Sequence, residues 1–281
     1  MSVVDQAIGR YPDVRRLLEV HERILNIQKG VREDSHKGTS VNWSNRTEIT
    51  NLQRKAIAMR RPIASFIDFS IFDTVSLRIT AKRLITLLVE QGFDRKEMEK
   101  LAEGIECRQR TISELAAGAL GERIECLEEV SSRWGISPKI LLLIADILIQ
   151  PCLEAISLNV DPSFLEKWGQ AECPVCGRRP IIAWLKSRKR YLACTLCGAE
   201  YAVDLFLCVN CGNVDPTYLK FLAPDGKPEF RVDFCEKCRH YVKVIDRDRL
   251  KTPIPRGLED IITLDLDLIA KNAGLKRLYF V

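Results

Sequence analysis

The chain has 281 residues, of which 46% are hydrophobic and 29% are charged, and its formal net charge is +5. This composition excludes a mostly disordered chain, a collagen-like chain and a coiled-coil rod, and the length predicts two domains or three small ones. The unusual feature is the presence of eleven cysteines.

Residues 1–171 are predicted to form an all-helical domain, because apolar residues recur in them at helical spacing. This part carries no glycine-rich phosphate loop and no nucleophile elbow, so nothing in it predicts catalysis. A short helix is expected after the capping pair Asp161-Pro162. The earlier candidate helices lie around Val14–Ile27, Leu77–Val89, Ile112–Leu120 and Ile124–Trp134.

No export or membrane segment is predicted, since the first residues lack the order of a signal peptide. The most apolar helix should begin after Ser137-Pro138, where the Ser137 hydroxyl is expected to cap it. It should end or kink at Pro151, well short of the ~20 residues that a bilayer needs. We therefore expect a cytoplasmic protein, in a compartment where paired cysteines indicate metal or redox chemistry more often than disulfides.

The cysteines are unevenly placed. Cys107, Cys126 and Cys152 are scattered singly, and we interpret them as packing residues. The other eight form four pairs, each with two residues between, and the gaps between successive pairs are 17, 10 and 23 residues. These pairs are Cys173/Cys176, Cys194/Cys197, Cys208/Cys211 and Cys235/Cys238.

Each pair is predicted to form a tight turn, or knuckle, that offers two thiolates to one ion. The residue after the second cysteine often needs a left-handed conformation, which glycine adopts easily. Gly177, Gly198 and Gly212 occupy that position in three knuckles, and Arg239 is less suited to it in the fourth. Two knuckles together make a tetrahedral four-thiolate site for zinc or iron.

The segments between knuckles predict which pairs share an ion. A hairpin with its turn at Lys186–Lys189 is expected in the first long gap, and one with its turn at Pro224-Asp225-Gly226 in the second. The simplest pairing is therefore sequential, with Glu200–Leu207 bridging the two modules as a strand. One metal would be held by Cys173, Cys176, Cys194 and Cys197, and the other by Cys208, Cys211, Cys235 and Cys238.

The predicted fold class is α plus small β, with a helical domain, two ribbon-like metal modules and a closing helix. The predicted domains are 1–171, 172–207 and 208–281. The closing helix is expected over about Leu258–Asn272, and its acidic residues are expected to form a solvated face. These acids are Glu259, Asp260, Asp265 and Asp267.

Other interpretations of these residues remain open. The cysteine pairs could be thioredoxin-type redox pairs or disulfides, although the regular spacing favours metal. Residues 1–171 hold 24 basic and 24 acidic residues, whereas residues 172–281 hold 19 and 14, so all the excess positive charge lies in the cysteine-rich part. That charge could offset the negative charge of the thiolates. Alternatively, Arg188-Lys189-Arg190 could bind a phosphate backbone, so a nucleic-acid-binding ribbon is an alternative function.

The cysteine-rich part resembles the FdhE family of formate dehydrogenase accessory proteins. The resemblance rests on Cys173-Pro174-Val175-Cys176-Gly177, on Arg190-Tyr191-Leu192 before Cys194, and on Cys208-Val209-Asn210-Cys211. It continues through Cys235-Glu236-Lys237-Cys238-Arg239-His240-Tyr241-Val242-Lys243 and through Glu259-Asp260 and Leu266-Asp267. It covers about residues 172–275, and the helical part fits only in length and class.

The resemblance implies two rubredoxin-like modules that bind iron or zinc through the eight paired cysteines. It implies a cytoplasmic, non-enzymatic maturation factor that binds the catalytic subunit of formate dehydrogenase and promotes assembly of the active enzyme. An alternative is a rubredoxin-type electron carrier that acts in maturation, because iron held by four thiolates is redox-active and zinc is not.

Overall fold

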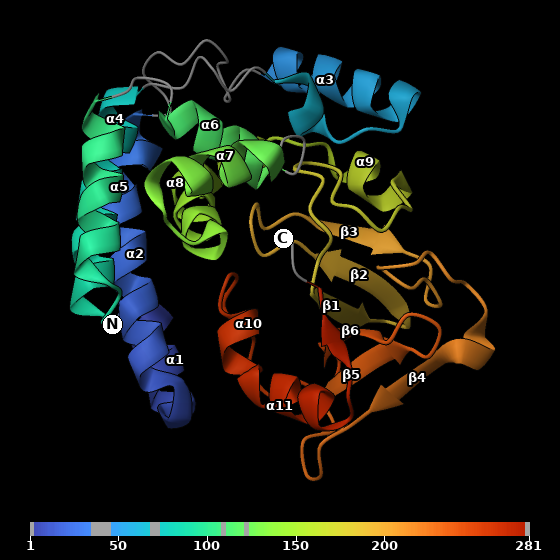
Figure 1. Ribbon diagram of the computed structural model, residues 1–281. Helices are drawn as coiled ribbons and strands as arrows, with labels where there is room; N and C mark the ends of the chain where they lie inside the picture. The colour runs from blue at the N-terminus through green and yellow to red at the C-terminus, as the bar shows by residue number, and fades with distance from the viewer. Residues whose placement is uncertain (1–2, 35–45, 68–73, 108–110, 121–123, 279–281) are drawn as a thin grey trace. The chain divides into compact units, whose positions relative to one another are not determined.

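The structure is a computed structural model that describes residues 3–34, 46–67, 74–107, 111–120 and 124–278 (Figure 1). The chain divides into two compact units. One is helical and contains residues 23–160. The other contains residues 161–280 together with residues 1–22, which form α1 (Val3–Arg10), η1 (Pro12–Val14) and the start of α2 (Arg15–Asp34).

The helical unit is an assembly of amphipathic helices around α8 (Pro138–Leu158). Helices α4, α6 and α7 pack against α8, while α2 is joined to it by a hydrogen bond from Gln28 to the carbonyl of Ile147 at 2.7 Å. The expected helical class of this part is therefore confirmed. Its other elements are α3 (Arg46–Met59), η2 (Ile63–Phe66), α4 (Thr74–Glu90), α5 (Arg95–Cys107), α6 (Thr111–Ala119) and α7 (Ile124–Trp134).

Helix α8 differs from its prediction at both ends. It begins at Pro138 as expected, but the Ser137 side chain makes no capping hydrogen bond. It continues through Pro151 for two further turns, because Cys152, Leu153 and Ile156 are buried there and their packing offsets the hydrogen bond that proline removes. By length and composition α8 could cross a membrane, and more than half of its apolar window is buried inside the structure.

The second unit is built on one mixed sheet whose strand order is β3-β2-β1-β6-β5-β4, with β7 also paired to β6 (Figure 1). The two predicted hairpins are present. The strand predicted over Glu200–Leu207 is found only at Glu200–Val203, as β3, and it lies at the edge of the sheet beside β2, so it does not bridge the modules. The strands are β1 (Ile182–Lys186), β2 (Lys189–Ala193), β3 (Glu200–Val203), β4 (Leu219–Leu222), β5 (Phe230–Cys235), β6 (His240–Asp246) and β7 (Lys276–Arg277).

Strand β6 joins the two ribbon modules, and no sequence pattern had predicted it. It pairs antiparallel with β5 of the second module and parallel with β1 of the first, where Ile182 lies opposite Lys243. The lysine in the middle of an apolar run obscured the strand signal. The two modules thus share one sheet, and the three-domain division of the chain stays a prediction.

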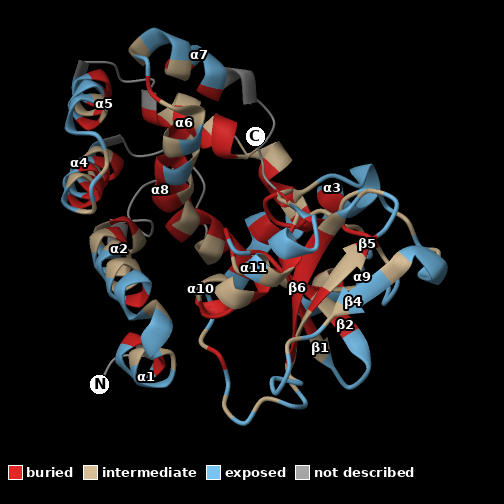
Figure 2. Cartoon of the chain, turned by 60° about the horizontal axis from the view of Figure 1, so that its bottom comes forward, coloured by how far each residue is buried: buried red, intermediate tan, exposed pale blue. Residues whose placement is uncertain are grey.

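Two short helices, α10 (Glu259–Ile262) and α11 (Leu264–Asn272), replace the single closing helix that was predicted. Helix α11 lies against β5 and β6, and Figure 2 shows β6 buried except at its two ends. Upstream, α9 (Pro162–Lys167) contacts β3. It is capped as predicted, because the carboxylate of Asp161 accepts a hydrogen bond from the Ser163 amide at 2.7 Å.

The acids of this helical segment do not form a solvated face as a group, so that expectation is wrong. The fully buried Lys243 of β6 lies 2.6 Å from a carboxylate oxygen of Asp260 and 2.8 Å from one of Asp267. Arg277 contacts both carboxylates at 2.7 Å. A buried cation needs such partners, so the lysine draws the acids inward and fixes α10 and α11 on the sheet.

Candidate metal centres

All four cysteine pairs form the predicted knuckles. In each one, the amide that follows the second cysteine donates to the carbonyl of the first, as from Gly177 to Cys173 at 2.9 Å and from Arg239 to Cys235 at 2.8 Å. The donor residue has a positive φ in every case, between 62° and 81°. This turn leaves both thiols of a pair on the same side of the backbone.

Two knuckle positions show how neighbouring side chains fit the turn. Arg239 adopts the left-handed φ of 62° that favours glycine, and its guanidinium donates to the carbonyl of Ala273 at the end of α11 at 2.7 Å. Gly198 leaves room for Arg256, whose guanidinium donates to the carbonyl of Cys197 at 3.1 Å. A Cβ at Gly198 would lie 2.2 Å from that guanidinium, so a larger residue here would displace Arg256 as well as strain the positive φ.

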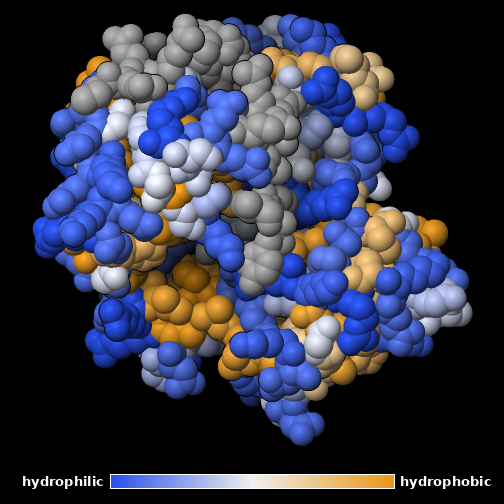
Figure 3. Space-filling model, in the orientation of Figure 1, coloured by the Kyte–Doolittle hydropathy of each residue, from blue (hydrophilic) through white to orange (hydrophobic). Residues whose placement is uncertain are grey.

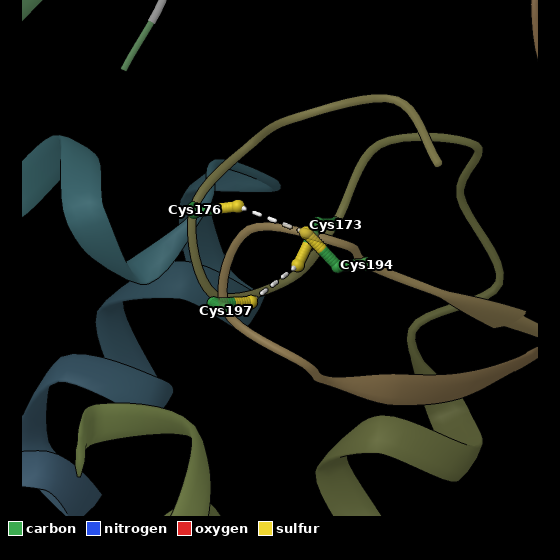
Figure 4. A group of neighbouring side chains, drawn as sticks. All are labelled: Cys173, Cys176, Cys194 and Cys197. Atoms are coloured by element: carbon green, nitrogen blue, oxygen red, sulfur yellow. Dashed lines mark hydrogen bonds between the residues drawn. The ribbon is translucent and has the colours of Figure 1, made fainter. Parts of the chain in front are cut away.

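The knuckles come together in the predicted sequential pairs. In the first centre the Cys173 and Cys197 sulfurs are 3.4 Å apart, as are those of Cys176 and Cys194 (Figure 4). In the second centre the sulfurs of Cys208 and Cys238 are 3.6 Å apart and those of Cys211 and Cys235 are 3.8 Å apart. Within each centre all four sulfurs lie within 4.8 Å of one another.

These distances suit a tetrahedral ion and do not suit disulfides. With metal–sulfur bonds of ~2.3 Å, a tetrahedral site has sulfurs about 3.8 Å apart, close to the 3.4–3.8 Å found here. A disulfide needs about 2.05 Å. The donor set is four soft thiols without a carboxylate or imidazole, which is the chemistry of zinc or iron. The two clusters are thus positioned to bind metal ions.

The two centres differ in exposure. Every cysteine of the first centre is buried, whereas in the second centre Cys211 is exposed and Cys238 is partly exposed. The first centre lies inside the unit, where Tyr201 of β3 packs nearby and donates its hydroxyl proton to the carbonyl of Ala171 at 2.8 Å. The second centre reaches the surface.

The surroundings shift the pKa values of the thiols in opposite directions. Burial raises the pKa of Cys173 and of Cys197, while hydrogen bonds from the neighbouring thiols lower the pKa of Cys194. In the second centre burial acts to raise the pKa of Cys238, but hydrogen bonds from His240 and Asn210 outweigh it and lower that pKa to about 6. A bound cation would stabilise all the thiols as thiolates.

The basic run of the first hairpin is divided by the fold. Arg188 is exposed in the turn between β1 and β2 and Lys189 is exposed at the start of β2, whereas Arg190 is buried and donates to the carbonyl of Leu207 at 2.6 Å. The run therefore does not present three cations on one surface. Of the three single cysteines, Cys152 is buried in α8 as predicted, and burial raises its pKa to about 12; the side chains of the other two lie outside the described residues.

The fold and these clusters define a class: a helical unit joined to a sheet unit that carries two tetracysteine centres. A family model described as "FdhE, central domain" matches residues 172–204, which span the first centre. The fold of this chain also resembles that of the FdhE protein from Pseudomonas aeruginosa, whose crystal structure matches it with a TM-score of 0.63. The match covers 98% of this chain and 89% of that one, at 18% sequence identity.

Curated relatives give the same family. A "Protein FdhE homolog" from Aquifex aeolicus is 32% identical over 54% of this chain and 56% of its own length. One from Stutzerimonas stutzeri is 31% identical over 43% of this chain and 41% of its own. The chain thus spans about half the length of the curated relatives it matches. The chain is therefore similar to proteins of the FdhE family in sequence and in fold.

Proposed function

We propose that this protein is a formate dehydrogenase accessory protein that binds the catalytic subunit and promotes assembly of the active enzyme. It acts in the cytoplasm, without catalysing a reaction of its own. The observation that carries the proposal is the pair of tetracysteine centres within a chain that is similar to proteins of the FdhE family. Because the centres tie together hairpins of one sheet, they hold a binding surface in shape.

We propose that each centre holds one metal ion, iron or zinc, through its four cysteines. The first ion would be held by Cys173, Cys176, Cys194 and Cys197, and the second by Cys208, Cys211, Cys235 and Cys238. Such an ion supplies folding energy to a module with a small core, and iron would add a one-electron couple. The protein's own contribution is to fix the sulfurs in tetrahedral array and to exclude water from the first centre.

The test is Cys173→Ala, with Cys152→Ala as the matched control. Three thiols bind the ion more weakly than four, so loss of one ligand should release the first metal. The first knuckle pair should then unfold, because metal binding supplies its folding energy. We expect the variant to lose one metal per chain and to stop capturing the purified catalytic subunit. The control removes a buried thiol that belongs to the helical unit and to neither centre, so it should keep both properties. Full maturation of the enzyme by Cys173→Ala would show the first centre to be dispensable.

The exposure of Cys211 favours one second candidate, a rubredoxin-type electron carrier. A thiolate at the surface shortens the path between an iron in the second centre and a redox partner. This function requires iron and a reversible change in the visible spectrum between oxidised and reduced protein. A colourless protein with two zinc ions that still matured the enzyme would eliminate it.

A further inference from the structure

The sheet carries a groove on the face opposite α10 and α11. Lys243 points to the helices, and because side chains alternate along a strand, its neighbour Val242 points to the other face. There a cavity of about 640 Å³ lies between the sheet and the segment 205–210. It is lined from β1, β2, β4, β5 and β6, so both modules contribute to it.

Large apolar side chains stand exposed in this groove. Leu205 is 43% exposed, Phe206 45% and Phe221 61%, and all three line the cavity. Phe206 comes from the segment between the modules and Phe221 from β4 of the second module. On the face of the molecule that Figure 3 shows, hydrophobic residues also reach the surface, in one larger group and in smaller ones among hydrophilic residues. Apolar side chains gathered in one hollow are typical of a binding surface.

The acids of the groove are already paired. Asp233 accepts two hydrogen bonds from Arg231, at 2.7 and 3.2 Å. Asp248 accepts from the Ser187 amide at 2.7 Å, and Asp246 lies 3.2 Å from the guanidinium of Arg249. Two of the three acids of the lining, Asp233 and Asp246, are thus already paired with an arginine.

Two cations in the groove have unused donors. Among the described residues, the exposed Arg188 makes no ion pair, and Arg190 is 5% exposed with its Nε lacking a hydrogen-bond partner. Only the donation from Arg190 to the carbonyl of Leu207 is made. Because a buried guanidinium donor without an acceptor is costly, it favours an incoming acceptor, and a carboxylate gives the strongest bond.

We propose that this groove binds an extended segment of the partner protein in which an acidic side chain lies beside large apolar ones. The apolar side chains would pack on Phe206 and Phe221, and the carboxylate would reach Arg188 and Arg190. The inference rests on the proposed function, because the partner is the catalytic subunit. Cys208 and Cys235 also line the groove, so the segment lies beside the second metal centre.

The test compares surface variants in binding to the purified catalytic subunit of formate dehydrogenase from the same source. The groove variants are Arg188→Glu, Phe221→Ser and the double variant. The matched controls are Lys271→Glu and Leu268→Ser on α11, where both residues are exposed and lie on the opposite side of the sheet. All chains are first checked for unchanged metal content and melting temperature, which is expected because every substituted residue is exposed.

We expect each groove variant to weaken binding at least tenfold, the double variant more, and the controls to bind as the wild type does. Wild-type binding should also weaken with salt, and Arg188→Glu should reduce this dependence. Groove variants that bind like the wild type would refute the groove as the binding site and would not contradict the proposed function. Equal loss in the controls would likewise overturn it. A wild-type protein that fails to bind the subunit would overturn both.

Discussion

Replacing Lys243 by methionine is predicted to destabilise the sheet unit by about 3–5 kcal/mol, the usual cost of removing one partner from a buried ion pair. The lysine side chain is 1% exposed and contacts Asp260 and Asp267 at 2.6 and 2.8 Å. Its ammonium also donates to the carbonyls of Asp260 and Thr263, at 2.9 and 3.3 Å. Methionine fills a similar volume, so the loss comes from charge and hydrogen bonds.

The size of the effect follows from charge balance. Lys243 and Arg277 together neutralise two carboxylates, and methionine leaves one carboxylate uncompensated among partly buried groups. Water cannot reach the position of the ammonium to replace it, because Lys243 is fully buried. At about 2–4 °C for each kcal/mol, the melting temperature should fall by roughly 6–20 °C.

The assay is thermal unfolding of the metal-loaded full chain, with metal content measured beside it. Lys276→Met removes the same charge from an exposed position of β7 and should change stability by less than about 0.5 kcal/mol. Adding Asp267→Asn to Lys243→Met restores the balance of charge. The double variant should therefore lose less stability than the sum of the losses in the two single variants. Additive losses, or a single variant that melts within about 2 °C of the wild type, would refute the reasoning.

Three further predictions concern the knuckles, the metal sites and acid stability. Gly212→Ala should lower the free energy of unfolding by about 1–2 kcal/mol through its positive φ alone. Gly198→Ala should lower it by about 1 kcal/mol more, because the new methyl group displaces Arg256 from the carbonyl of Cys197. Equal melting temperatures of the two variants would contradict this. Under a metal chelator, the centre with the exposed Cys211 should lose its ion first, leaving about one metal per chain, and simultaneous loss of both would count against the difference in burial. Burial acts to raise the pKa of Asp260, but its cationic partners outweigh this and lower the pKa below the ordinary 3.8. The stabilisation by this carboxylate is therefore present above about pH 4 and is lost on further acidification. When unfolding is followed against pH, the wild type should lose stability in acid more steeply than Asp260→Asn does.

The metal centres were the most predictable part of the molecule. A pair of cysteines with two residues between has one compact turn available to it, and the left-handed residue that follows is visible in the sequence as Gly177, Gly198 and Gly212. Sequential pairing followed from the hairpins, whose turns are signalled locally. The fourth knuckle forms the same turn although Arg239, which was predicted to be less suited to it, occupies the position with the positive φ.

The errors lie where a distant contact decided the outcome. Pro151 did not end α8, because burial of the following turns outweighed a local preference. Acids expected in solvent became partners of Lys243, and nothing near them in the sequence indicates a buried cation. Arg190, one of three neighbouring basic residues, is buried although its neighbours are exposed.

The sequence by itself determined the class of the fold, the knuckles and the partition of eight cysteines into two centres, because those features depend on residues close in the chain. Only the tertiary structure decided that both modules share one sheet through β6, that one centre is buried and the other exposed, and that Phe206, Phe221 and Arg190 meet in a groove. These features require side chains far apart in sequence to pack together. Local periodicity and turn chemistry carry no record of such packing.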